Sequence, residues 1–201
     1  VETWINKKAA SSMKSCVVSY FAPHLTSFTS QSFLRMKQRD YGILFDAAPQ
    51  LRTLSLVATV SLAESAVLSL VAEKLPNLTE LSLSKFPAVD IFGTLLDKRS
   101  VCRLSLTSLT ICDMQNLICP TASWTNEENN LRSLTIARAS VRFLFTLNKQ
   151  LFSFISFLNN LTELTIQDLG DDMHFGDKFI LQGVPRKILQ QLTSLDLDRS
   201  K

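Results

Sequence analysis

The catalytic chemistry open to this 201-residue chain is limited, because it contains only two histidines, His24 and His174. Neither stands in a sequence context that would bring a nucleophile and a base to working distance. The sequence also contains no glycine-rich phosphate loop and no HExxH-type zinc motif. We therefore expect no catalytic residues, and an enzyme is the least favoured class of function.

One acidic turn holds residue types that bind metal ions. Asp171, Asp172, His174 and Asp177 follow one another closely, and hard oxygen ligands can share one ion with an imidazole. Their spacing matches no defined metal-binding loop, so we interpret them as a solvated acidic turn. We expect no metal and no cofactor.

The four cysteines are Cys16, Cys102, Cys112 and Cys119. Cys102, Cys112 and Cys119 could in principle be zinc ligands, but they form no CxxC pair, and we expect them to be small core residues. They also lack the paired clusters that flank secreted repeat domains, and no signal-peptide pattern opens the chain. These features favour a reducing compartment, the cytoplasm or the nucleus.

A spacing of leucines indicates which elements must position any functional residue. Leucine, two residues, leucine, one residue and an aliphatic residue recur six times, with steps of 27, 28, 25, 30 and 31 residues. The six units are Leu51-x-x-Leu54-x-Leu56, Leu78-x-x-Leu81-x-Leu83, Leu106-x-x-Leu109-x-Ile111, Leu131-x-x-Leu134-x-Ile136, Leu161-x-x-Leu164-x-Ile166 and Leu192-x-x-Leu195-x-Leu197. Each unit has the period of two of a strand, and the segments that follow change to helical spacing. Leucine-rich repeats characteristically run at about 20 to 29 residues. The pattern therefore predicts an α/β fold, a leucine-rich repeat solenoid or horseshoe, with a parallel sheet on its concave side and helices on its convex side.

The predicted organisation is one solenoid behind an N-terminal extension. Residues 1–50 should form a helical cap, in which Leu25-x-x-Phe28-x-Ser30 is either cap or a degenerate first repeat. Residues 51–201 should hold the six recognisable units, the last of them incomplete. Helices are expected in residues 62–74, 89–96 and 141–158 and after Pro185, with a surface loop around Trp124. Because the chain begins at Val1 and stops just after the sixth predicted strand, we expect it to belong to a larger protein.

The residues between the consensus leucines should point away from the core in columns about 4.8 Å apart. Most are serine or threonine, which suit exposed strands by propensity alone, so a merely solvated sheet would explain them. The alternative is an open concave floor that binds a protein or peptide, with sparse charged contacts. The candidate partner-binding residues are Arg52, Glu80, Arg132, Glu163, Asp196 and Asp198.

The net charge and the hydropathy of the chain argue against binding to nucleic acid and against a membrane-spanning segment. The formal net charge is only +3, from 21 Lys and Arg against 18 Asp and Glu, which gives no basic surface of the kind that nucleic acids require. The most apolar stretch, residues 141–158, contains Arg142, Asn148, Lys149 and Gln150 and is too polar to span a membrane. The sequons at Asn77 and Asn160 are glycosylation acceptors only if the chain is secreted, and otherwise each asparagine simply precedes a consensus leucine.

The segments at residues 75–83, 159–166 and 192–197 resemble the longer, helix-containing intracellular leucine-rich repeats of the ribonuclease-inhibitor and F-box receptor type. Their irregular lengths also resemble the repeat region of the Zyg family of cullin-ligase substrate receptors. Such receptors dock through an F-box or an elongin-binding box, and neither motif occurs in this chain. The resemblance implies a protein–protein interaction module, the substrate-recognition part of a cullin-RING ubiquitin ligase receptor whose adaptor binds outside this chain. A non-catalytic scaffold or a stoichiometric inhibitor is the alternative.

Overall fold

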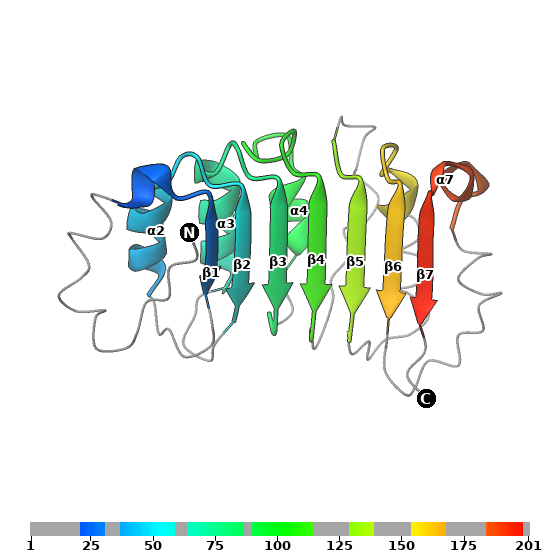
Figure 1. The fold of residues 1–201 in the computed structure, drawn as a ribbon, viewed down its shortest axis with the longest axis horizontal. Helices are drawn as coiled ribbons and strands as arrows, with labels where there is room; N and C mark the ends of the chain where they lie inside the picture. The colour runs from blue at the N-terminus through cyan, green and yellow to red at the C-terminus, as the bar shows by residue number, and fades with distance from the viewer. Residues whose placement is uncertain are drawn as a thin grey trace.

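The computed structural model describes residues 21–30, 37–58, 64–86, 90–114, 129–138, 154–167 and 184–198. It shows an α/β fold built on one seven-stranded sheet (Figure 1). The strands are β1 (Ser27–Ser30), β2 (Thr53–Val57), β3 (Glu80–Ser84), β4 (Ser108–Cys112), β5 (Ser133–Ala137), β6 (Glu163–Gln167) and β7 (Ser194–Asp198). They lie side by side in the order of the sequence, and each neighbouring pair is parallel.

The described helices lie behind this sheet in the view of Figure 1. They are α2 (Gln38–Ala47), α3 (Glu64–Lys74), α4 (Ile91–Leu95) and α7 (Arg186–Gln191), and a 3-10 turn, η1 (Ala22–His24), precedes β1. Residues 154–156 add one helical turn. Parallel strands require a return segment between them, because each strand must start from the same edge of the sheet. The helices of neighbouring returns therefore pack on each other, α2 on α3 and α3 on α4.

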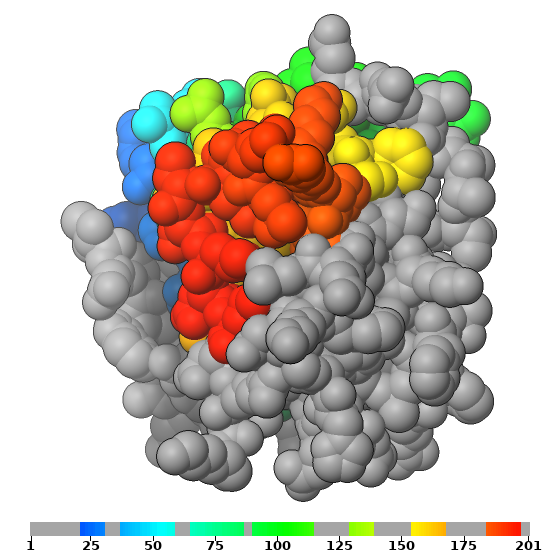
Figure 2. All heavy atoms as spheres, turned by 90° about the vertical axis from the view of Figure 1, so that its right-hand side faces the viewer, coloured from blue at the N-terminus to red at the C-terminus, as the bar shows by residue number. Residues whose placement is uncertain are grey.

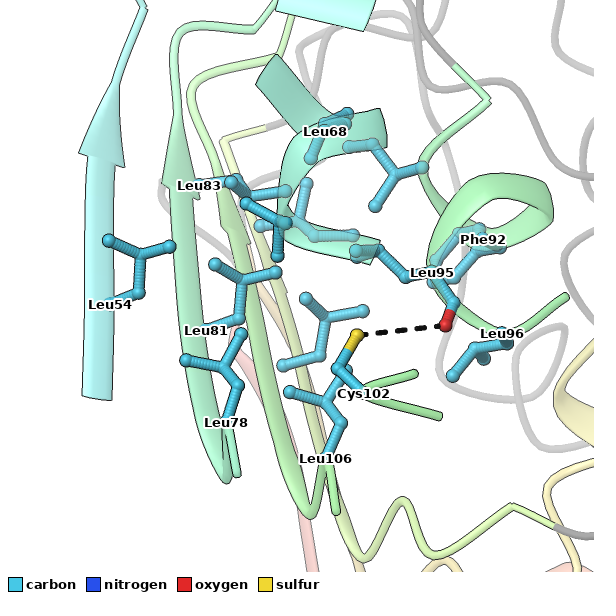
Figure 3. Packing of buried hydrophobic residues seen from close by; sticks show 14 of the residues in the cluster. Leu54, Leu68, Leu78, Leu81, Leu83, Phe92, Leu95, Leu96, Cys102 and Leu106 are labelled. Atoms are coloured by element: carbon cyan, nitrogen blue, oxygen red, sulfur yellow. Dashed lines mark hydrogen bonds between the residues drawn. The ribbon is translucent and has the colours of Figure 1, made fainter. Parts of the chain in front are cut away.

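The core lies between the sheet and the helices and consists mainly of the consensus leucines. In the first five units the three aliphatic positions are at most 3 % exposed, and Leu81 and Leu134 are 2 % and 0 % exposed, as predicted. Figure 3 shows leucines of neighbouring strands pointing toward Leu68 of α3 and Phe92 of α4. Each strand thus covers the apolar side chains of its neighbours, which no single strand could cover alone.

Local sequence explains where the helices begin and which face they bury. The Asp90 carboxylate accepts a hydrogen bond from the Gly93 N–H at 2.7 Å and caps α4. The Asp40 carboxylate accepts the Lys37 N–H at 3.1 Å at the start of α2. In α3, Val67, Leu68 and Val71 are fully buried, since residues three and four apart share one helix face.

The sequence predicted all six strands centred on the middle leucines, and each is confirmed. The position proposed for a degenerate first repeat also forms a strand, β1, which pairs with β2. Helices are confirmed in the predicted segments at residues 62–74 and 89–96 and after Pro185. The first twenty residues, the Trp124 loop, the acidic turn at residues 171–177 and most of residues 141–158 lie outside the described residues.

The last strand, β7, is an edge strand with a neighbour on one side only, as is β1 at the other end of the sheet. Figure 2 looks onto β7 and shows this strand (red) at the surface, with α7 (orange) beside it. Leu195 is 39 % exposed, whereas Leu164, which pairs with it on β6, is 0 % exposed. The open edge beyond β7 therefore leaves this consensus leucine partly exposed, whereas Phe28, at the same position of the other edge strand β1, is 7 % exposed and belongs to the core.

Candidate functional site

The strand register arranges polar residues, among them the predicted binding residues Glu80, Glu163 and Asp196, in continuous rows on the face of the sheet opposite the helices, here called the open face. The first row is Thr53, Glu80, Ser108, Ser133, Glu163 and Ser194. The second row is Ser55, Ser82, Thr110, Thr135, Thr165 and Asp196. All of these side chains are half-buried or exposed, while the aliphatic residues between them point into the core. The two predicted columns that lie within the strands are confirmed, because every neighbouring pair of strands keeps the same register.

Arg52 and Arg132 directly precede β2 and β5, and on the next strand each has a glutamate bonded to its carbonyl, which gives two arginine–glutamate pairs at the start of the open face. The backbone carbonyl of Arg52 accepts the N–H of Glu80 at 2.9 Å, and the carbonyl of Arg132 accepts the N–H of Glu163 at 2.9 Å. Each glutamate therefore pairs in register with the hydroxyl residue that follows the arginine, Glu80 with Thr53 and Glu163 with Ser133, one position along the chain from that arginine. All four side chains are exposed, and the Thr53 hydroxyl donates to Glu80 Oε2 at 3.3 Å. The sheet brings four of the six predicted residues into two equivalent pairs.

The other two predicted residues lie on β7, away from these pairs. Asp196 is exposed in the second row, and its Oδ2 accepts a hydrogen bond from Gln167 Nε2 of β6 at 2.8 Å. Asp198 pairs with Gln167 in the strand register, but its side chain lies outside the described part of the chain. Asp196 therefore marks the edge-strand end of the open face.

Some of the hydroxyl residues have a structural task that the sequence analysis did not assign. Four threonines at the starts of strands donate their hydroxyls to the backbone carbonyl of the preceding strand at 3.0 to 3.2 Å. They are Thr79, Thr107, Thr162 and Thr193. This ladder joins one strand to the next, so these threonines need no ligand to explain them.

The asparagines that precede consensus leucines form a second ladder. Asn77 Nδ2 donates to the Pro49 carbonyl at 2.9 Å, and Asn130 Nδ2 donates to the Leu104 carbonyl at 2.6 Å. Asn160 Nδ2 donates in the same way to the Asn129 carbonyl. Asn77 and Asn160, the two sequon residues, therefore join successive turns, which favours the structural interpretation of both.

A charged cluster at the carboxyl ends of β3, β4 and β5 was missed by the sequence analysis. Arg138 donates to both carboxylate oxygens of Asp113, Nε to Oδ1 at 2.6 Å and Nη2 to Oδ2 at 3.2 Å. The Ser84 hydroxyl donates to Asp113 Oδ2 at 3.0 Å. These bonds from Arg138 and Ser84, together with the charge of Lys85, hold the pKa of Asp113 below its usual range despite partial desolvation.

The backbone of this cluster adopts an uncommon conformation. Lys85, Asp113 and Arg138 each follow the last residue of a strand, and their φ angles are 61°, 54° and 51°. This left-handed conformation costs an L-residue other than glycine roughly 1 to 2 kcal/mol. The signal available in the sequence was the charged residue that directly follows three successive strands, alternating in sign.

One groove lies on the helical side, between α2 and α3. It has a volume of about 380 Å³ and is lined by Gln38, Arg39, Gly42, Ile43, Asp46, Leu70 and Lys74. A salt bridge between Lys74 Nζ and Asp46 Oδ2 at 2.6 Å spans its wall. These lining side chains include no pair of a nucleophile and a general base, so the groove gives no basis for catalysis.

The cysteines differ from one another in their environment. Cys102 is fully buried, as predicted, and burial raises the pKa of its thiol although the Ser100 hydroxyl lies 3.2 Å away. The prediction of a core position is wrong for Cys112, which is half-exposed at the end of β4. It follows the buried Ile111, and successive strand residues face opposite sides. Cys119 lies outside the described residues.

The described ranges contain neither a metal-binding cluster nor a membrane-spanning helix. No group of three His, Cys, Asp or Glu side chains there could hold a metal ion. No helix within the same ranges has the length and apolar character needed to cross a membrane. Comparison of the chain with protein-family models, with curated proteins and with solved structures found no match.

Proposed function

We propose that this chain is a leucine-rich repeat solenoid that binds a partner protein on its open, concave face and carries out no catalysis itself. One observation supports the proposal above others. Six successive strands place their hydroxyl and charged side chains in uninterrupted rows on one face, while the leucines and isoleucines of the first five are buried on the other. Such a surface is long, polar and made of small side chains, which suits an extended protein segment.

The charged residues are best placed to provide specificity. Arg52, Glu80, Arg132 and Glu163 are exposed, and exposed charges contribute little to folding. Across an interface, complementary charges speed association and exclude partners with the wrong charges. We therefore assign partner selection to these four residues, and affinity to the area buried over the serine and threonine rows.

We further propose that the parent protein is the substrate receptor of a cullin-RING ubiquitin ligase in the cytoplasm or nucleus, with its adaptor bound outside this chain. The resemblance of the repeats to intracellular receptor repeats motivates this step. Binding energy at the sheet would hold the substrate at high effective concentration near a ligase carried by other subunits. This mechanism requires no chemistry from the repeat domain.

The test is affinity purification of the full-length protein, followed by mass spectrometry, with the wild type beside the Glu80→Lys, Glu163→Lys double variant. We expect a cullin and its adaptor with both proteins, and the substrate with the wild type alone. A different result would be a single partner that co-purifies in an amount equal to the full-length protein, without a cullin. If the abundance of that partner also does not rise when the full-length protein is depleted, an inhibitor or scaffold function would replace this proposal. Partners that are identical for both proteins would remove the open face from the mechanism.

A further inference from the structure

The open face carries a repeat of higher order than the leucine pattern. Between the first two consensus apolar positions of the seven strand units, the residue pairs are Thr26-Ser27, Arg52-Thr53, Thr79-Glu80, Thr107-Ser108, Arg132-Ser133, Thr162-Glu163 and Thr193-Ser194. The order hydroxyl–hydroxyl, arginine–hydroxyl, threonine–glutamate is thus completed twice and begins a third time. The exposed residues therefore repeat every three strands, although the core residues repeat every strand.

The backbone geometry is the same in both copies. The Arg52 carbonyl accepts the N–H groups of Thr79 and Glu80 at 2.8 and 2.9 Å. The Arg132 carbonyl accepts those of Thr162 and Glu163 at the same two distances. The two arginine–glutamate pairs are therefore related by a shift of three strands, which is about 14 Å at the usual strand separation.

Folding gives no reason for this spacing. Among the described residues, neither arginine forms an ion pair with the glutamate beside it, and all four side chains are exposed. The neighbouring threonines stabilise the strands through their hydroxyls. Of the four charged side chains, that of Glu80 accepts the Thr53 hydroxyl at 3.3 Å, and this exposed contact contributes little. Their charges are available to a ligand that has the same spacing.

We infer that the open face binds an extended peptide segment that crosses the strands and carries oppositely charged residues with a four-residue repeat. This deepens the partner-binding function proposed above and rests on it. Four residues of extended chain span about 13 to 14 Å and return to the same face. An α-helix returns to one face after seven or eleven residues, at about 10 or 16 Å, and matches the spacing less well.

The order of charges in the ligand follows from the pairs themselves. An acidic side chain at position i meets Arg52, and the acidic side chain at i+4 meets Arg132. A basic side chain at i+2, about 7 Å along the peptide, meets the glutamate on the next strand, and i+6 repeats this at the second pair. The recognised segment therefore alternates acidic and basic residues at every second position.

The experiment uses this chain and synthetic fluorescein-labelled peptides rich in threonine and valine, read by fluorescence anisotropy. The matching peptide carries glutamate at i and i+4 and lysine at i+2 and i+6. The control peptide has the same residues plus one inserted between the two halves, which changes the spacing and turns the second half to the other face. We expect the matching peptide to bind about tenfold more tightly than the control peptide, and more weakly as salt rises.

Variants of the protein separate spacing from net charge. Arg52→Glu and Arg132→Glu should each lower the affinity for the matching peptide by a similar factor. The control variant Lys98→Glu makes the same charge change in an exposed turn away from the open face. It should leave the affinity for the matching peptide within about twofold of the wild type. The inverted pair Arg132→Glu, Glu163→Arg should prefer a peptide whose second half has its charges exchanged.

The outcomes distinguish this inference from the proposed function. The four-residue repeat is overturned if the protein binds the matching and control peptides with equal affinity. It is also overturned if the Arg132→Glu, Glu163→Arg variant still prefers the original matching peptide. If no peptide binds while the full-length protein still loses its partner through Glu80→Lys and Glu163→Lys, the extended-peptide inference fails and the partner-binding function stands. If that double variant also keeps its partner, both fail.

Discussion

Replacing Leu134 with alanine tests how the core is shared between strands. Leu134 is 0 % exposed, and its register partners Leu109 and Leu164 cover it from both sides. The substitution removes three carbon atoms, which is about 2.4 kcal/mol of lost transfer free energy at about 0.8 kcal/mol each. A cavity enclosed on both sides adds to this loss, so we expect the free energy of unfolding to fall by about 3 to 4 kcal/mol.

The matched control is Leu195→Ala, the same substitution at the same consensus position. Leu195 is 39 % exposed and pairs only with Leu164. The substitution therefore loses roughly three-fifths of the transfer free energy of a fully buried leucine, and it leaves no closed cavity. We expect a loss of about 1.5 kcal/mol. The measurement is urea unfolding followed by circular dichroism, with midpoint and slope compared for wild type and both variants. A loss at Leu134 no larger than that at Leu195 would refute the account in which strands bury one another.

Three further predictions follow from the surface and the helix ends. Glu80→Lys combined with Glu163→Lys should shift the free energy of unfolding by less than about 1 kcal/mol while weakening partner binding in a pull-down titration, and unaltered affinity would move the site to an edge loop. Asp113→Asn should lower stability at neutral pH by about 0.5 to 1 kcal/mol, because an exposed ion pair with Arg138 contributes little. The folded-state pKa of Asp113 is lowered, so the carboxylate stabilises the fold above its unfolded pKa near 4, and this stabilisation is lost as pH falls through the folded-state pKa. In urea unfolding, the difference in stability between wild type and Asp113→Asn should therefore shrink below about pH 4. A difference that stays constant with pH would contradict the ion pair. Asp90→Ala should cost about 1 kcal/mol by thermal unfolding, since the Gly93 N–H loses its acceptor, and an unchanged midpoint would show that the cap contributes nothing.

The two charged surfaces differ in what their charges do. At the ends of β3 to β5, Arg138 and Ser84 bind the Asp113 carboxylate, so these charges are largely used within the protein. The arginine and glutamate pairs of the open face have no ion pair within the described residues. For this reason we assign recognition to the open face and treat the cluster around Asp113 as part of the framework at its edge.

The sequence by itself determined the strands, their order along the chain and the identity of the residues that face the core. Six strands were placed by their leucines because a period of two puts alternate residues on opposite faces, and because each repeat must bury its apolar side against the next. The same rule explains why Cys112 lies on the open face directly after the buried Ile111, although the sequence analysis expected it in the core.

Only the tertiary structure decided which polar residues became neighbours. The return segments have different lengths, and the alignment of Thr53 with Glu80, which also brings the Glu80 N–H to the Arg52 carbonyl, follows from the hydrogen bonds between strands. Asp113 meets Arg138 across 25 residues because both follow strands that stand side by side, in a backbone conformation that no consensus leucine signals. Local patterns fix what each residue faces, whereas contacts between distant polar side chains depend on the register in which whole strands assemble.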